Sequence, residues 1–175
     1  MSNTTEKKRG RGRPKGATAK PLMELVTERK RLHGNADVFE ILCQANIVAE
    51  ESEELAAQGL RVFNDRNGAV KPIIMWALKK SIKSKLPTGK TPYTPNNAPS
   101  TDLTETSLRF EHKKFKYFVT ETVNTNKRQA MWIELLEGIP KNESELLDLV
   151  KDKKWPFKSI TKEIAQKAFP DVDFD

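Results

Sequence analysis

The sequence predicts an all-α protein of about seven helices, a small helical domain that follows a disordered basic N-terminal tail. Three observations lead to this fold class. Apolar residues recur at intervals of three and four through most of the chain, as they do on one face of a helix. Residues that cap or end helices, such as Asn, Thr, Gly and Pro, stand between these runs. No two alternating apolar segments are joined by a hairpin turn, so no β-sheet is predicted.

The first 20 residues carry most of the net charge. The 175-residue chain has 31 Lys and Arg residues against 24 Asp and Glu residues, a net charge of +7. Seven of the basic residues and one acidic residue, Glu6, lie in residues 1–20, which leaves a body of net charge +1. Because this segment has no aromatic and few aliphatic side chains, it cannot bury enough surface to offset the entropy of ordering. It is predicted to be disordered when free.

An N-terminal helical region is expected over residues 21–85. Apolar residues at near-helical spacing predict a first helix over 21–33, which Gly34 would end. Asn35 is suited to cap a second helix, because its side chain can accept a hydrogen bond from a free amide of the first turn. The apolar face of this second helix comprises Val38, Ile41, Leu42 and Ala45.

Two more helices complete this region. The third is expected from about Val48 to Phe63. The fourth is a buried helix from 70 to 82, in which Pro72 falls in the first turn, where a missing amide donor costs little. Residues 86–102 contain four prolines and many Thr, Ser and Asn residues. They are predicted to form an extended loop or a linker between domains.

A C-terminal helical region is predicted over residues 103–170. The apolar residues of its first two helices are Leu108, Phe115, Phe118 and Val119, and Met131, Ile133, Leu135 and Leu136. Gly138 is expected to end the second of these helices. Asn142 and Thr161 are suited to cap two shorter helices. Residues 171–175 form an acidic tail in which acidic and apolar residues alternate.

The basic N-terminal tail contains a distinctive run of residues. This run is Arg9, Gly10, Arg11, Gly12, Arg13, Pro14, Lys15 and Gly16. It resembles the AT-hook, a short DNA-binding peptide built on Arg-Gly-Arg-Pro with flanking basic residues. The minor groove of an A·T tract is narrow and strongly negative, and no guanine amino group projects into it. Because Gly12 has no Cβ, the backbone can approach the base edges while Arg11 and Arg13 point along the groove in opposite directions.

This resemblance implies that the tail holds A·T-rich double-stranded DNA through its minor groove. Many AT-hooks have a proline before the first core arginine, where this chain has Gly10, so the peptide is less preorganised and binds more weakly. Other interpretations fit the same composition. They are a basic solubilising tail, an arm that binds RNA or any polyanion, and a nuclear-targeting peptide.

A second basic stretch lies between Arg66 and Thr101, where no acidic residue occurs. Four of its residues would lie near one face of the fourth predicted helix: Lys79, Lys80, Lys83 and Lys85. A cluster of cations on one face is suited to bind phosphates, so these lysines are predicted to make secondary contacts with DNA. A solvated helix face explains the same pattern equally well.

Few residues have the spacing that catalysis or metal binding needs. Residues 89–91, Gly-Lys-Thr, resemble the end of a phosphate-binding loop, but Ser84 stands where that loop needs a glycine. Cys43 lies in an apolar helical pattern that is typical of a core thiol. His33 and His112 are far apart in the sequence and cannot form a zinc site by themselves. No enzymatic activity, catalytic residue, metal site or cofactor is therefore predicted.

Three stretches of the body form a second recognisable pattern. They are Lys85-Leu86-Pro87 with Pro92-Tyr93 and Pro95-Asn96, then Trp132-Ile133-Glu134-Leu135-Leu136-Glu137, then residues 151–158 leading to Ala168-Phe169-Pro170. The pattern resembles an uncharacterised family of large contractile-tailed phages, especially those of marine bacteria, which is known as a domain of unknown function. The resemblance covers roughly residues 38–170. It implies a phage origin and a mostly helical fold, and it transfers no catalytic residue.

Together these features predict a non-enzymatic phage DNA-binding accessory protein. Its tail would hold A·T-rich DNA, while its helical body would bind a protein partner or assemble. The alternatives are a virion or assembly protein whose tail touches genome or RNA without specificity, and a host-directed regulator that docks through its acidic end or the region of Trp155. No apolar run is long enough to cross a membrane, so the expected location is the cytoplasm of the host cell or the virion.

Overall fold

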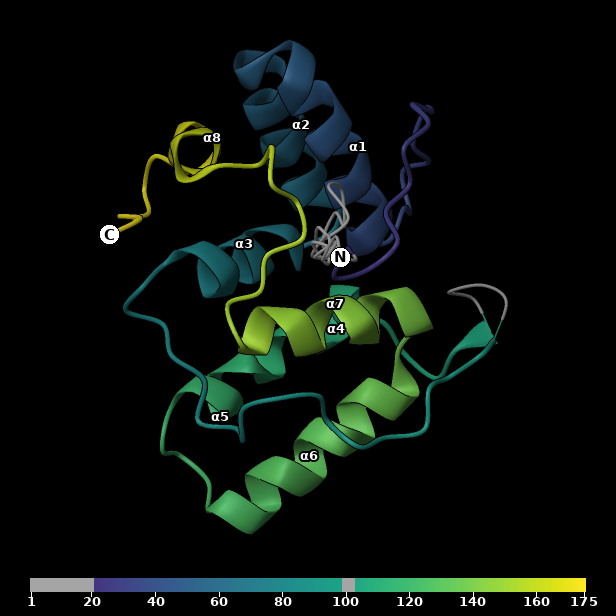
Figure 1. Ribbon diagram of the computed structural model, residues 1–175, viewed down its shortest axis with the longest axis vertical. Helices are drawn as coiled ribbons and strands as arrows, with labels where there is room; N and C mark the ends of the chain where they lie inside the picture. The colour runs from purple at the N-terminus through teal and green to yellow at the C-terminus, as the bar shows by residue number, and fades with distance from the viewer. Residues whose placement is uncertain (1–20, 99–102) are drawn as a thin grey trace, which may run out of the picture.

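The computed structural model describes residues 21–98 and 103–175, and in these ranges it has helices and no strand (Figure 1). The predicted all-α fold class is therefore confirmed. In chain order the helices are α1 (Val38–Glu51), α2 (Glu53–Arg66), α3 (Val70–Leu78), α4 (Leu108–Glu111), α5 (Lys116–Val119), α6 (Thr125–Gly138), α7 (Lys141–Lys151) and α8 (Lys162–Ala168). A 3-10 turn at His112–Phe115 joins α4 and α5, which leaves seven separate helical stretches in the described residues. The tail predicted over residues 1–20 lies outside them.

The helices surround one hydrophobic core. α1 and α2 form an antiparallel pair at one end of the molecule, and α8 packs against α2 (Figure 1). α3 and α7 pack against each other beneath this pair, and α6 lies at the opposite end. The buried apolar side chains run from Met23 to Val172, so both halves of the chain contribute to the same core.

A cluster of aromatic rings joins α3 to the C-terminal half of the chain. The ring centroid of Trp76 lies 5.3 Å from that of Phe115 and 5.9 Å from that of Trp132. The Phe118 ring lies 5.0 Å from Trp132. These rings meet edge to face, an arrangement that adds about 0.5–1.5 kcal/mol per pair to the effect of burial. They therefore fix α3 against the 3-10 turn at His112–Phe115 and against α6.

The start of α1 and the boundary between α1 and α2 differ from the predicted ones. Asp37 caps α1 in place of Asn35: its Oδ1 accepts a hydrogen bond from the Glu40 N–H at 2.8 Å, and the Glu40 carboxylate accepts from the Asp37 N–H at 3.2 Å. This reciprocal capping box satisfies two free amides at once. Ser52 caps α2, so Val48, the expected start of that helix, belongs to α1. The predicted apolar face of α1 is confirmed, because Val38, Ile41, Leu42 and Ala45 are buried.

The helix predicted over residues 21–33 is wrong, because this segment has no helix and runs alongside α1 (Figure 1). Gln44 of α1 binds its backbone: Oε1 accepts from the Lys30 N–H at 2.9 Å, and Nε2 donates to the Glu28 carbonyl at 3.0 Å. These bonds replace helical ones. The apolar residues that pack on the core are Met23, Leu25, Val26 and Leu32. Their spacing thus reflects contacts of a non-helical segment with α1.

α3 is shorter than predicted. Pro72 lies in its first turn as expected, but the helix ends before Lys79 and does not continue to Ile82. The ammonium group of Lys153 donates to the carbonyl oxygens of Trp76 and Lys79. Because a longer helix would use both of these oxygens to accept its own hydrogen bonds, this tertiary contact competes with extension of α3.

The C-terminal helices follow the predictions more closely. The helical stretch at 108–119 carries the predicted apolar residues, of which Leu108, Phe115 and Phe118 are buried. α6 ends at Gly138, as predicted. Thr161 caps α8, because its Oγ1 accepts a hydrogen bond from the Ile164 N–H at 3.4 Å. In these helices the local cap and stop signals agree with the tertiary contacts.

Asn142 does not cap α7: the cap position is Pro140, and the helix begins at Lys141, two residues earlier than predicted. The Ser144 N–H donates to the Pro140 carbonyl at 3.0 Å, and the Ser144 hydroxyl donates to the Lys141 carbonyl at 2.9 Å. Ser144 is fully buried, whereas Asn142 is exposed. The burial of Ser144 therefore determines where α7 begins, although Asn142 is the better capping residue by sequence.

A buried carboxyl group joins α7 to the start of α4. Glu143 is 1% exposed, and its Oε2 accepts a hydrogen bond from the Leu108 N–H at 2.8 Å. No described residue is a hydrogen-bond partner of its Oε1. Burial first, and then the nearby carboxyl group of Asp37, raise the pKa of Glu143 to about 8, although Leu108 and the Arg109 guanidinium oppose the shift. Glu143 is therefore mostly protonated at neutral pH.

Candidate nucleic-acid interface

The residues predicted to contact DNA fall into two groups. Residues 9–16, which resemble the AT-hook, lie outside the described residues. The other group, Lys79, Lys80, Lys83 and Lys85, lies in the segment that follows α3. These lysines do not share a helical face, because α3 ends before the first of them, so this part of the prediction is wrong. Their contact with phosphates stays a prediction. We call residues 79–90 the basic segment.

The start of the basic segment is held by the end of α7 and by the C-terminus. Lys153 has a left-handed φ of 60°, and the Lys154 N–H donates to the Leu149 carbonyl at 3.0 Å, which closes α7 in a Schellman turn. This turn directs the Lys153 ammonium to the carbonyl end of α3. Burial lowers the pKa of Lys153 to about 8, although the residue as a whole is exposed. The Lys79 ammonium donates to the Asp173 carbonyl at 2.7 Å.

The middle of the basic segment lies against α5. The Lys85 N–H donates to the Phe118 carbonyl at 2.8 Å, and the next side chain, Leu86, is buried in the core. The Lys85 ammonium lies 3.7 Å from the Glu121 carboxylate, but both side chains are largely exposed. An exposed ion pair of this kind stabilises a fold by at most about 1 kcal/mol. The backbone contact, and not the ion pair, therefore positions Lys85.

The end of the basic segment is clamped by a buried lysine of α7. The Lys151 ammonium donates to the carbonyl oxygens of Pro87 at 3.0 Å and Gly89 at 2.7 Å, and it lies 3.0 Å from the Asp152 carboxylate. Asp152 in turn accepts from the Gly89 N–H at 3.0 Å. Gly89 has a φ of +98°, a conformation that residues with a Cβ rarely adopt. A neighbouring Lys–Asp pair thus holds both peptide groups of Gly89.

A second carboxylate of α7 fixes the residue after Lys90. Asp148 accepts from the Thr91 N–H at 3.0 Å and from the Thr91 hydroxyl at 2.6 Å. The indole N–H of Trp132 donates to the same hydroxyl at 3.0 Å. The amide groups of Gly89 and Thr91 therefore donate to carboxylates of the protein itself, which differs from a phosphate-binding loop.

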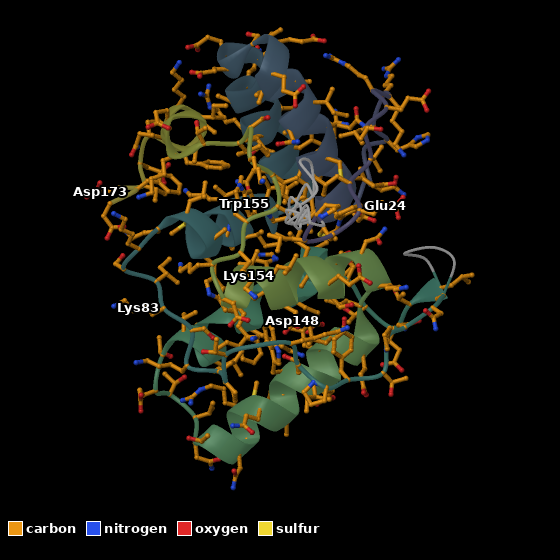
Figure 2. The ribbon with its side chains drawn as sticks, viewed as in Figure 1. Glu24, Lys83, Asp148, Lys154, Trp155 and Asp173 are labelled. Carbon is orange, nitrogen blue, oxygen red and sulfur yellow. The ribbon has the colours of Figure 1, made fainter. Side chains whose placement is uncertain are left out.

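These contacts leave the lysine side chains of the basic segment at the surface. Lys80, Lys83 and Lys90 are exposed, and no described residue forms a hydrogen bond or an ion pair with their ammonium groups. Figure 2 shows Lys83 pointing away from the edge of the molecule. The fold therefore holds the backbone of the segment in place, while these three ammonium groups face solvent.

The N-terminal end of the described chain lies beside the basic segment. Leu22, Lys90 and Lys154 line one surface hollow of about 530 Å³. The carboxylates that share this hollow belong to Glu145, Asp148 and Asp152, and the last two are bound to Lys151 and to backbone amides. Leu22, near the start of the described chain, therefore lies close to Lys90.

The acidic end is folded against the body. The Lys71 ammonium lies 2.5 Å from the Asp171 carboxylate, and the amide group of Gln166 donates to the Val172 carbonyl at 2.6 Å. Val172 is 9% exposed. Trp155, the other residue considered for docking, is half-buried, and its N–H is bound to the carbonyl of residue 160. The acidic end is thus packed on α3 and α8, and Trp155 is packed against the core.

The structure also places Cys43, His33 and His112, the three other residues considered for catalysis or metal binding. Cys43 is buried, and burial raises the pKa of its thiol to about 11, so it is protonated at neutral pH. His112 Nδ1 lies 2.9 Å from the Arg109 carbonyl oxygen, and His33 is exposed. The described part of the chain has no group of three or more His, Cys, Asp or Glu residues arranged to hold a metal ion. It also has no helix that is both long and apolar enough to span a membrane.

The residues that position the basic segment were missed by sequence reasoning. They are Asp148, Lys151, Asp152 and Lys153. The only signal in the sequence is their charge near the end of an apolar helical pattern, and such charges usually lie on a solvated face. Their inward direction depends on how the loop at 86–98 and the end of α3 pack against α7, which no local pattern specifies.

Comparison with known proteins gives one match. No curated protein matches the chain, and no solved structure matches it. The model of a family of unknown function, DUF6433, matches residues 49–156. This range includes α2, α3, α6 and α7 together with the whole basic segment. Because the match covers more than half of the chain, the protein belongs to the DUF6433 family.

Proposed function

We propose that this protein is a non-enzymatic, phage-encoded DNA-binding accessory protein. Its N-terminal tail holds A·T-rich duplex DNA through the minor groove, and its helical body binds a second protein. The observation that carries the proposal is the run at residues 9–16, in which two arginines flank a glycine and a proline follows. This arrangement places two guanidinium groups along a narrow, negative groove.

The arrangement of the body supports this division of labour. The tail carries most of the net charge, and Leu22, which follows it closely in the sequence, lies close to Lys90. DNA held by the tail would therefore lie near the exposed lysines of the basic segment, where phosphates can bind without base recognition. Under this proposal the tail provides sequence preference and the basic segment adds affinity.

The experiment compares the full chain with residues 21–175. Each is titrated with A·T-rich duplex, G·C-rich duplex and single-stranded RNA of equal length across a salt series. The full chain should prefer the A·T-rich duplex, with a log-log salt slope of about −4 to −5 if about five phosphates are neutralised. Residues 21–175 should lose that preference. Equal binding of the full chain to all three nucleic acids would refute minor-groove recognition.

A second candidate is a virion or assembly protein with a tail that binds any polyanion. Gly10, which takes the place of the usual proline, favours this candidate because it leaves the peptide less preorganised for one groove. The two candidates also differ in location. The accessory protein should occur in infected cells and be absent from purified particles, whereas the assembly protein should remain in the particles.

A further inference from the structure

An open groove lies on the face formed by α1, α2 and residues 29–32. Its volume is about 440 Å³. The floor and one wall are apolar and include Ile41, Ala45, Val48, Leu55, Val62 and Phe63. Leu55 is 57% exposed and Val62 is 46% exposed, although both are large apolar residues. A partner that covers Leu55 and Val62 would therefore remove apolar surface from water, which favours binding.

The groove exists because the segment before α1 is not helical. Gln44 ties Glu28 and Lys30 to α1, so this segment forms the far wall while α2 forms the near one. Gly59 lies in the near wall, and a Cβ atom added to it would have no neighbour within 4 Å. A side chain at this position would therefore project into open space.

The rim of the groove is basic. Arg29, Lys30, Arg31 and Arg66 line the groove, whereas no acidic residue does. Glu51 lies 3.4 Å from Arg29, and Glu40 lies 3.7 Å from Lys30, but the side chains of both pairs are 38–70% exposed and such pairs are weak. No described residue forms an ion pair with Arg31 or Arg66. The rim therefore keeps uncompensated positive charge beside an apolar floor.

We infer that this groove binds an acidic amphipathic helix of a partner protein. The α2 wall from Leu55 to Arg66 is about 16 Å long, so it can accommodate about three turns of a helix. Apolar side chains at i, i+3 or i+4, and i+7 of that helix would cover the floor, and its flanking carboxylates would meet the rim. The phosphates of a nucleic acid would pair with the basic side chains of the rim, but they would leave the apolar floor exposed to water. A second copy of this chain would bring two basic rims together.

The inference rests on the proposed role of the body in binding a protein, and its test contains no DNA. The probe is a fluorescein-labelled synthetic peptide of 14 residues with leucines at helical spacing and glutamates elsewhere. Two control peptides have the same composition in scrambled order, or lysine in place of every glutamate. The full chain should bind the acidic amphipathic peptide at least tenfold more tightly than either control in fluorescence polarisation. Equal binding of the three peptides, or no binding, would overturn the inference.

Variants of Gly59 locate the site. Gly59→Trp should fill the groove and weaken binding at least tenfold, while Gly59→Ala adds one methyl group and should leave binding within about twofold. Both substitutions replace glycine inside a helix, so neither is expected to unfold α2. Unchanged binding by Gly59→Trp would place the peptide elsewhere and refute the proposal. A dimer of the full chain that Gly59→Trp dissociates would assign the groove to a second copy instead.

Charge variants test the rim. Arg31→Glu combined with Arg66→Glu should weaken binding of the acidic peptide at least tenfold, and the effect should diminish at high salt. Lys116→Glu combined with Lys127→Glu is the matched control, because it makes the same change in charge on α5 and α6, away from α1 and α2 (Figure 1). Equal effects of the rim and control variants would show that net charge, and not this groove, attracts the peptide. A failure of DNA binding would leave all of these results unaffected.

Discussion

The Lys151 ammonium donates a hydrogen bond to the Gly89 carbonyl at 2.7 Å, although the two residues are 62 positions apart in the sequence. Lys151 is 3% exposed, and its partners are two carbonyl oxygens and the carboxylate of Asp152, with Asp148 at 3.8 Å. A buried charge is tolerated only when such partners compensate for the loss of water. This contact makes the basic segment part of the folded body and not a free linker.

Replacing Lys151 with Met should destabilise the protein by about 3–5 kcal/mol, because it leaves the Asp148 and Asp152 carboxylates without their buried cation. The free energy of unfolding is measured by urea denaturation. Lys85→Met is the control, because it removes the same charge from an exposed pair and should cost at most about 1 kcal/mol. A loss below 1 kcal/mol for Lys151→Met would contradict the proposed clamp.

Glu143 should make the protein less stable as the pH rises from about 4.5 to about 8. Its pKa is raised from 4.5 to about 8 in the folded protein, so between these values the folded state binds more protons than the unfolded state. The free energy of unfolding then falls by up to about 1.4 kcal/mol per pH unit. Asp37, whose pKa burial raises to about 6, adds a slope of the same sign at lower pH.

Glu143→Gln tests this assignment, because glutamine does not titrate and its amide oxygen can still accept from the Leu108 N–H. Urea denaturation at pH 5, 6.5 and 8 should show a much flatter profile above pH 6 than in the unmodified protein. Glu145→Gln, which changes a carboxylate near Lys141 at the surface, should keep the original profile. Equal slopes in the unmodified protein and Glu143→Gln would exclude Glu143 as the source.

Changing Arg11 and Arg13 together to Ala should lower the preference for A·T-rich over G·C-rich duplex at least tenfold. The reason is that each arginine is expected to reach the floor of the minor groove, where one base contact is worth about 1–3 kcal/mol. Lys7 and Lys8 changed to Ala remove the same charge and should weaken binding to both duplexes alike. Fluorescence anisotropy at fixed salt measures the affinity of each variant for the A·T-rich and the G·C-rich duplex. The same loss of preference in both double variants would contradict a role for Arg11 and Arg13 in base recognition.

Changing Lys80 and Lys83 to Ala should weaken binding to both duplexes to the same extent and reduce the magnitude of the salt slope by up to about 2, because each phosphate contact contributes nearly one unit. Lys79 is left intact, since its ammonium is bound to the Asp173 carbonyl. Arg31 and Lys158 changed to Ala give a variant of equal charge outside the basic segment. If that variant weakens binding equally, the basic segment has no special role.

The sequence alone was sufficient for the fold class and for much of the core. The apolar periodicity from Val38 to Ala45 marked a face that is buried, and Gly138 and Thr161 marked a helix end and a helix cap that the structure retains. These features depend on contacts between residues close in sequence, so local patterns carry the information. The AT-hook-like motif is likewise local, and the functional proposal for the tail rests on it entirely.

The tertiary structure decided the features that depend on distant partners. Gln44 binds the backbone of Glu28 and Lys30 in place of the predicted helix, and Lys153 binds the carbonyl end of α3, which is shorter than predicted. In both cases a side chain from elsewhere in the fold satisfies backbone groups that the local pattern assigned to a helix. The sequence thus determined the helical class, the cap of α8 and the basic motif of the tail. Only the packed structure determined where α3 ends, how the basic lysines are presented and where a groove opens. These features depend on hydrogen bonds between backbone groups and side chains that are distant in the sequence.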